Sequence, residues 1–173
     1  IAEVIVAKTL ALSWQSVCAA YGTPAGATSE VVSGFGVVGF GKLGGIELGF
    51  SSDLDLVFIH QDAPADEMTV GDKSVSLGEF YTRLGRKMIS LLTTRTFSGP
   101  LYDIDLRLRP NGKSGLLVTS VSAFASYQKR QAWTWEHQAL IRARFIAGCD
   151  QIDSAFNRIR AEVLSKEREI DTL

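Results

Sequence analysis

The sequence predicts an α+β fold in which a small mixed β-sheet, with acidic residues on one edge, is backed by helices. Residues 34–60, GFGVVGFGKLGGIELGFSSDLDLVFIH, read as a buried strand, a tight glycine-rich turn, a short helix-capable piece and a second strand. Residues 102–109 alternate strictly between apolar and charged side chains, as in a half-buried strand. Residues 77–95 have the apolar spacing of a helix.

The remaining elements follow from local patterns. Residues 1–20 favour an amphipathic helix, and residues 22–33 form a small-residue linker or surface loop. Residues 61–74 are acidic and contain a proline and a glycine, which is typical of an exposed loop. We expect the first helix to bury four apolar residues: Val4, Ile5, Leu12 and Val17.

The second half of the chain continues in the same way. The helix at 77–95 should end at residues 98–100, SGP, because proline and glycine terminate helices. Residues 116–118 could return as a further strand, residues 121–147 look like one or two helices, and residues 151–170 like another. We expect the helix at 77–95 to bury its apolar face: Phe80, Leu84, Met88, Ile89, Leu91 and Leu92.

Composition limits the possible functions. The 173 residues are 46% hydrophobic and 21% charged, which is enough for one sizeable core. A formal net charge of −1 argues against a general nucleic-acid or membrane-surface binder. The sequence contains no run of about 18 uninterrupted apolar residues, so we expect no membrane span. Cys18 and Cys149 lack metal-ligand spacing and are predicted to be buried thiols in a reducing compartment. The chain begins with Ile, so we expect an excerpt of something longer.

The second strand of the central stretch opens with Asp53-Leu54-Asp55. Side chains alternate along a strand, so the two carboxylates share one face, about 6–7 Å apart at the backbone, while the leucine points into the core. Two such carboxylates raise each other's pKa unless a cation lies between them. Mg²⁺ carrying a nucleotide phosphate is the natural cation beside a glycine turn. An isolated Asp-x-Asp pair is more commonly a solvated strand end.

Two phosphate-binding fingerprints fit the glycine turn poorly. Residues 39–44 spell GxGxxG, and Asp62 stands where a dinucleotide-binding fold places its ribose-binding acid. The eight residues 45–52 are, however, too short for the crossover of about 10–12 residues that a parallel βαβ unit needs. Residues 36–42 imitate a Walker A loop, but Leu43 replaces its Mg²⁺-binding Ser or Thr.

A better fit is the polymerase-β-like nucleotidyltransferase pattern, in which a strand ends in Gly plus a small or polar residue and Asp-x-Asp follows on the next strand. Here Gly41-Lys42 stands at the first position and Asp53-x-Asp55 at the second. The resemblance implies a third acid on a neighbouring strand, which Asp105 supplies. Three carboxylates from two adjacent strands can hold two Mg²⁺ about 4 Å apart.

Three longer blocks make the match closer. GFGKLGGIELGFSSDLDLVFIH, LYDIDLRLRPNGKSGLLVTS and WTWEHQALIRARFIAG together resemble the glutamine-synthetase adenylyltransferase family over residues 34–148. The resemblance implies a cytoplasmic enzyme with two fused nucleotidyltransferase copies, one attaching AMP from ATP to a tyrosine of glutamine synthetase and one removing it by phosphorolysis. The segments LGFSSDLDL, IDLRLRPNGKSGLLV and WEHQALIRAR are similar to the C-terminal, AMP-attaching copy.

The resemblance also implies partners and boundaries. Glutamine synthetase is the expected protein substrate, with PII signalling proteins and glutamine as possible effectors, no nucleic acid and no membrane. We expect a monomer within a larger chain. Residues 1–33 would be an N-terminal helix and linker, 34–148 the catalytic domain, and 149–173 a helix leading into a further helical domain. The alternatives are the AMP-removing copy or a regulatory module that is inactive alone.

The family's roles transfer residue by residue. Asp53 and Asp55 match the metal-binding pair, and Asp105 would bind the second ion or take the proton of the tyrosine hydroxyl. The resemblance gives the remaining residues to phosphate: backbone N–H groups at Gly41, Gly44 and Gly45 as an anion cradle, Lys42 and Ser52 as contacts, and Arg107 and Arg109 as charge stabilisers.

Each of these accessory residues also has an ordinary interpretation. Arg107 and Arg109 could instead form structural ion pairs with Asp103 or Glu136, and Lys42 could simply be exposed. His60 is expected to be an ordinary residue at a strand end, and Glu47 to cap or brace the turn. The aromatic cluster in residues 133–137 could stack on a base but is more typical of core packing, and it comprises Trp133, Trp135 and His137.

Overall fold

The computed structural model describes residues 1–49, 52–97, 99–100 and 102–166. Its helices in these ranges are α1 Ala2–Tyr21, α2 Gly41–Gly44, α3 Leu77–Leu92, α4 Val121–Arg130, α5 Thr134–Ile141 and α6 Asp150–Leu164, with a 3₁₀ turn at Gly112–Ser114. Its strands are β1 Phe35–Gly39, β2 Leu54–His60, β3 Arg95–Thr96, β4 Gly99–Pro100, β5 Ile104–Asp105, β6 Val118–Ser120 and β7 Arg144–Gly148.

The central sheet is mixed, as predicted. Its strands lie in the order β5-β2-β1-β7, and β6 also pairs with β2. β1 runs antiparallel to both β2 and β7, whereas β5 and β6 run parallel to β2. Because β1 and β2 are antiparallel, no βαβ crossover joins them, which excludes the dinucleotide-binding interpretation. Asp62 instead lies beyond the far end of β2 and accepts hydrogen bonds from the backbone and side chain of Ser122.

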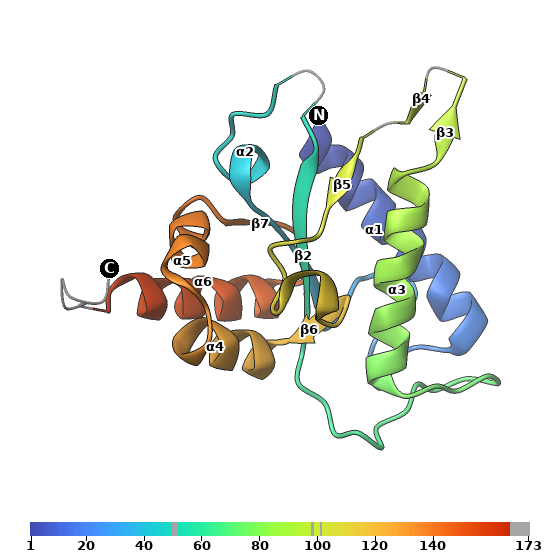
Figure 1. Cartoon of the computed structure of the whole chain (residues 1–173). Coiled ribbons are helices and arrows are strands. Elements are labelled where there is room, and N and C mark those ends of the chain that lie inside the picture. Colours follow the sequence, from blue (N-terminus) through green and yellow to red (C-terminus); the bar gives the residue numbers. More distant parts are fainter. Residues whose placement is uncertain (50–51, 98, 101, 167–173) are drawn as a thin grey trace.

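Helices cover both faces of the sheet (Figure 1). Leu54, Leu56 and Phe58 of β2 point into a core shared with α1 and α3. Val57 and Ile59 point into a second core shared with α4, α5 and α6. This alternation is that of a strand buried on both sides. It leaves Asp55 on the face of α4–α6, at the end of β2 where the strand begins.

The N-terminal helix α1 belongs to the first of these cores. Trp14 is fully buried, with its ring edge-on to Phe80 of α3 at 5.3 Å between centroids. Leu12 and Val4 are exposed, so their predicted core positions were wrong. Each residue turns a helix by about 100°, which puts Leu12 about 200° from the buried Leu10.

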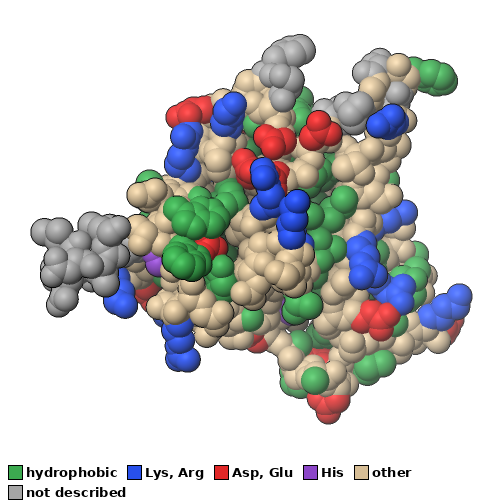
Figure 2. All heavy atoms as spheres, viewed as in Figure 1, with side chains coloured by type: hydrophobic (Ala, Val, Ile, Leu, Met, Phe, Trp, Pro, Cys, Tyr) green, Lys and Arg blue, Asp and Glu red, His purple; other side chains and the backbone are tan. Residues whose placement is uncertain are grey.

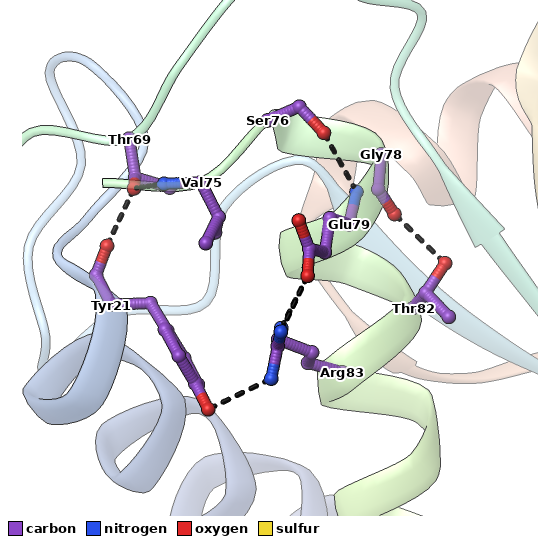
Figure 3. Close-up of polar contacts among 8 residues, drawn as sticks. All are labelled: Tyr21, Thr69, Val75, Ser76, Gly78, Glu79, Thr82 and Arg83. Atoms are coloured by element: carbon purple, nitrogen blue, oxygen red, sulfur yellow. Dashed lines mark hydrogen bonds and ion pairs between the residues drawn. The ribbon is translucent and has the colours of Figure 1, made fainter. Parts of the chain in front are cut away.

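A polar network joins the end of α1 to the start of α3 (Figure 3). The backbone carbonyl of Tyr21 accepts a hydrogen bond from the Thr69 hydroxyl at 2.5 Å. The phenolic hydroxyl of Tyr21 accepts one from Arg83 at 2.8 Å. Arg83 also pairs with Glu79, and Ser76 caps the helix by accepting from the Glu79 N–H at 3.3 Å. Most of the loop at residues 61–74 is exposed, as predicted, and Thr69 ties it to the end of α1.

Among the described residues, α1 alone is long and apolar enough to cross a membrane by length and composition. A core helix meets the same criterion, and here Val6, Leu10 and Trp14 are buried against the rest of the fold. The two cysteines are free thiols. Cys18 is buried, and burial raises the pKa of its thiol to about 11.

Three predicted elements differ from the structure. The strand at 102–109 is shortened to β5, because the chain turns at residues 107–111 and the alternation there serves a loop. Residues 121–147 contain α4 and α5 but end in the strand β7, whose first residues favour helix as readily as strand. Helix α3 ends at Leu92, before the predicted stop at residues 98–100, of which Ser98 lies outside the described residues. Leu91 is exposed, so its predicted core position was wrong.

Candidate active site

Three carboxylates converge where β2 and β5 begin to pair. The parallel register joins Asp55 to Asp105, and Asp53 comes directly before the first residue of β2. One carboxylate oxygen from each of the three lies within 4.8 Å of the others. The expectation that acids from two neighbouring strands meet beside the glycine turn is confirmed by this geometry.

The cluster is electrostatically strained at its centre. Burial, followed by the charges of Asp53 and Asp105, raises the pKa of the Asp55 carboxyl. Asp105 behaves differently, because hydrogen bonds from Arg107 hold its pKa below the ordinary value. The Arg107 backbone N–H donates to Asp105 Oδ1 at 2.8 Å, and Nε donates to Oδ2 at 2.6 Å. A cation placed among the three would relieve the repulsion that Asp55 experiences.

Figure 2 shows this arrangement on the molecular surface. Acidic side chains gather near the top of the face, with Lys or Arg side chains directly beside them. Arg107 is the cation paired with the cluster, and its side chain is 69% exposed. Arg107 pairs with Asp105, rather than with the Asp103 or Glu136 considered from the sequence. Because β5 ends at Asp105, Arg107 lies outside the strand and does not share a strand face with Asp105.

The glycine turn is built against the central carboxylate. The N–H of Phe40 donates to the Asp55 carbonyl at 2.9 Å, which joins the end of β1 to the start of β2. Gly41 has a φ of +52°, and a Cβ at this position would collide with the Asp55 carboxylate. Only glycine combines that backbone conformation with the lack of a side chain. The turn therefore fixes Asp55 by direct contact.

The other two glycines of the turn serve packing. A Cβ on Gly44 would collide with the backbone carbonyls of Arg142 and Gly39, and one on Gly45 would collide with the Arg142 guanidinium. The N–H groups of Gly44 and Gly45 donate to the carbonyls of Phe40 and Gly41, at 2.9 and 3.0 Å. Both N–H groups are thus bonded to carbonyls within the turn, whereas the expected anion cradle would need them to donate to phosphate.

The remaining predicted phosphate contacts lie at different places. Lys42 is exposed on α2, close enough for its charge to lower the pKa of Asp55. Ser52 accepts a hydrogen bond from the Gly49 N–H at 3.2 Å, across residues 50–51, which lie outside the described residues. Lys42 and Ser52 stay predictions as phosphate contacts.

Arg109 organises the loop that follows the acids. Its guanidinium donates to the carbonyl oxygens of Leu106 at 2.8 Å, Lys113 at 3.1 Å and Gly115 at 3.4 Å. Three backbone acceptors occupy this side chain, so the structure gives it a bracing role in the loop at 106–115. It is not brought to the carboxylate cluster.

Sequence reasoning missed the side chains that hold the turn from outside. Arg144 of β7 donates from Nε to the Gly44 carbonyl and from Nη2 to the Leu43 carbonyl, both at 3.2 Å. Arg142 forms an ion pair with Glu47, which confirms that Glu47 braces the turn. The signal for them was present as two arginines spaced by one residue in the block that carried the family resemblance.

The two tryptophans of the aromatic cluster are not in the core, whereas His137 is half-buried. Trp133 is 71% exposed and Trp135 55% exposed, so the prediction of core packing was wrong for both. They flank the start of α5, where the buried Glu136 carboxylate accepts from the Trp133 N–H at 2.8 Å and from the Tyr127 hydroxyl at 2.8 Å. Burial of Glu136 fixes the helix start and leaves the indoles outside.

The site and its sheet define an α+β domain with a candidate divalent-cation centre of three carboxylates beside a glycine turn. Comparison of the sequence with protein families gives a match over residues 1–159 to the family described as glutamate-ammonia ligase adenylyltransferase. The chain belongs to this family.

Similar proteins share one description, bifunctional glutamine synthetase adenylyltransferase/adenylyl-removing enzyme. The relative from Pseudomonas syringae pv. tomato is 53% identical over 174 residues, which cover 100% of this chain and 18% of that protein. The relative from Pseudomonas putida is 51% identical with the same coverage. The relative from Pasteurella multocida is 50% identical over 173 residues, which cover 100% of this chain and 17% of that protein. The chain therefore spans less than a fifth of these relatives.

Proposed function

We propose that this segment is a nucleotidyltransferase domain of the polymerase-β-like fold that transfers AMP from ATP to a tyrosine hydroxyl of glutamine synthetase, with release of pyrophosphate. The observation that carries the proposal is the convergence of Asp53, Asp55 and Asp105 within 4.8 Å beside the glycine turn. Relatives named as adenylyltransferases match this chain over its whole length, which supports the same assignment.

The three carboxylates suit a hard divalent cation such as Mg²⁺, which prefers carboxylate oxygens together with substrate phosphates. They present only oxygen donors, and burial, followed by the charges of Asp53 and Asp105, raises the pKa of Asp55. Bound there, Mg²⁺, as one ion or two, would neutralise the phosphate charge of ATP. Asp53, Asp55 and Asp105 would hold it.

The protein's own residues account for orientation. Arg107 keeps Asp105 ionised by lowering its pKa, which suits a ligand role better than proton abstraction from a tyrosine whose ordinary pKa is about 10. Because Arg107 is largely exposed, its guanidinium is also available to a phosphate group at the same edge. Lys42 stands on the turn beside Asp55 as a second cation for phosphate.

The AMP-removing reaction is the second candidate, because the relatives' printed description includes both activities. The motifs LGFSSDLDL and WEHQALIRAR favour the attaching copy. The same three carboxylates would serve either reaction. Attachment transfers AMP from ATP to the tyrosine oxygen, and removal transfers AMP from the tyrosine oxygen to phosphate.

The test is an adenylylation assay with the full-length protein, ATP, Mg²⁺ and glutamine synthetase. We expect AMP to appear on glutamine synthetase and to be lost with Asp53→Asn or Asp55→Asn in this segment. A parallel reaction with adenylylated glutamine synthetase and phosphate follows release of ADP. If the substitutions abolish ADP release and leave AMP attachment intact, this segment is the removing copy. If both activities survive them, the site is assigned wrongly.

The proposal extends to regulation, oligomeric state, location and domain boundaries. Regulation by PII proteins and glutamine, a monomeric state and a cytoplasmic location are proposals that follow from the family resemblance. The boundaries at 33/34 and 148/149 are also proposals, although α1 and α6 share cores with the sheet. A segment without activity of its own would show Mg²⁺-dependent ATP binding in calorimetry but no transfer.

A further inference from the structure

We propose that Arg144 is a positioning residue for the glycine turn, and that Glu3 of α1 sets the orientation of its guanidinium. The inference deepens the proposed function, on which it rests for its kinetic consequence. It adds a residue outside the carboxylate cluster to the catalytic apparatus and makes the N-terminal helix part of the catalytic unit.

Arg144 contacts the end of α2. This short helix carries Gly41, against which the Asp55 carboxylate packs, and Lys42. The last carbonyls of a helix have no partner within it. Here the carbonyls of Leu43 and Gly44 accept from the Arg144 guanidinium, each at 3.2 Å. One side chain thus holds the last residues of α2, at the other end of this short helix from Gly41.

Arg144 is itself anchored. Its backbone pairs with Gly39 in the β1–β7 register, at the residue where β1 leads into the turn. Its Nη1 and Nη2 donate to the two carboxylate oxygens of Glu3 at 3.2 and 2.6 Å. This bidentate pair leaves Nε and Nη2 directed at the two carbonyls, a geometry that a planar guanidinium permits and a lysine ammonium does not.

Helix α1 is rigid. Glu3 lies in its first turn, Trp14 in the middle is buried, and Tyr21 at the end is tied to Thr69 and Arg83. The helix is therefore fixed to the fold along its length. A fixed Glu3 holds Arg144, Arg144 holds the turn, and the turn holds Asp55 in place.

The experiment compares Arg144→Gln, Arg144→Lys and Glu3→Gln in the full-length protein. Arg160→Gln is the matched control, because Arg160 also donates to the last carbonyls of a helix, those of Leu140 and Ile141 of α5, without touching the turn. Two readouts are taken: steady-state adenylylation per folded molecule over an ATP series, and hydrogen exchange of the peptide covering residues 40–47 by mass spectrometry.

We expect Arg144→Gln to lower kcat/KM for ATP by about 10- to 100-fold, the typical cost of losing an outer positioning contact. Exchange at residues 40–47 should become faster. Arg144→Lys should restore melting temperature more than it restores kcat/KM. Glu3→Gln should shift both readouts in the same direction by less, and the double variant should lose less than the sum because the two residues act as one unit.

Two results would overturn the inference. One is a kcat/KM for Arg144→Gln that equals that of Arg160→Gln per folded molecule, which would reduce Arg144 to a structural residue. The other is unchanged exchange at residues 40–47. Failure of the proposed function looks different: the unsubstituted protein transfers no AMP and Asp53→Asn changes nothing. Calorimetry with Mg²⁺ and ATP then replaces kinetics, and weaker binding with Arg144→Gln but not with Arg160→Gln upholds the positioning role.

Discussion

Asp55 of β2 and Asp105 of β5 are register partners in a parallel strand pair. The pair is only two residues long, and the Leu54 N–H extends it by donating to the Asp103 carbonyl at 2.8 Å. Backbone pairing, rather than any attraction between the side chains, therefore brings the two carboxylates together. The fold supplies the free energy that holds like charges at this edge of the sheet.

Asp55→Asn is predicted to remove function without loss of stability. The neutral amide removes the cost of burying a charge and the repulsion from Asp53 and Asp105, which together raise the Asp55 pKa, so the melting temperature in EDTA should stay the same or rise. Turnover should fall by at least about 100-fold, as for other preorganised electrostatic groups. Calorimetry with Mg²⁺ and adenylylation rates check the two parts. A marked drop in melting temperature in EDTA would mean that Asp55 is structural.

Gly41→Ala is predicted to damage the site more than the fold. The new Cβ meets the Asp55 carboxylate at a φ of +52°, so the turn or Asp55 must move. Gly78→Ala is the control, since nothing lies within 4 Å of a Cβ there and the residue is in α3. That control should gain about 0.4–1 kcal/mol of stability. Equal activity for the two variants would contradict a turn built against Asp55.

Trp14→Ala should destabilise the whole fold rather than release a dispensable helix. Trp14 is fully buried against Phe80, and its indole donates to the Thr28 carbonyl at 2.9 Å. We expect a loss of about 3–5 kcal/mol in the free energy of unfolding. Leu12→Ala, at a residue 60% exposed, should change it by about 0.5 kcal/mol or less. Urea denaturation measures the free energy of unfolding of both variants. Similar losses for the two would mean that the core face of α1 is assigned wrongly.

The central stretch was predictable because local signals there agree with the tertiary structure. Apolar runs marked β1 and β2, the glycines marked the turn, and strand alternation placed Asp53 and Asp55 on one face. Asp105 needed the family pattern, since nothing in the sequence says which later strand pairs with β2. The parallel register of β5 is a non-local fact.

The errors have a common physical origin. The alternation in residues 102–109 resembles a long strand, yet Arg107 and Arg109 fold back onto Asp105 and onto loop carbonyls, which end β5 early. Strand β7 was hidden because its antiparallel pairing with β1 joins segments that lie far apart in the sequence. The clamp of Arg144 on Leu43 joins residues 101 positions apart, beyond the reach of any spacing rule.

His60 gives a prediction about pH. The side chain is half-buried at the end of β2, its ring stacks on Tyr81 at 5.0 Å, and Nδ1 lies 2.7 Å from the Gln61 carbonyl. Burial lowers its pKa below the model-peptide value of 6.5. Below pH 6.5, His60 takes up a proton in the unfolded chain more readily than in the folded chain. His60 therefore stabilises the fold above pH 6.5. This contribution is lost as the pH falls from 6.5 to the lower pKa of the folded state.

His60→Phe keeps the ring stack and removes the titration, so its stability should fall less between pH 6.5 and 5 than that of the unsubstituted protein. One proton contributes at most about 1.4 kcal/mol per pH unit to this slope. Both proteins should carry Asp55→Asn, because the raised pKa of Asp55 adds a stability term that grows as the pH falls. Urea unfolding at each pH gives the slopes. If His137→Gln flattens the slope and His60→Phe does not, the chain's other histidine is responsible and the assignment to β2 fails.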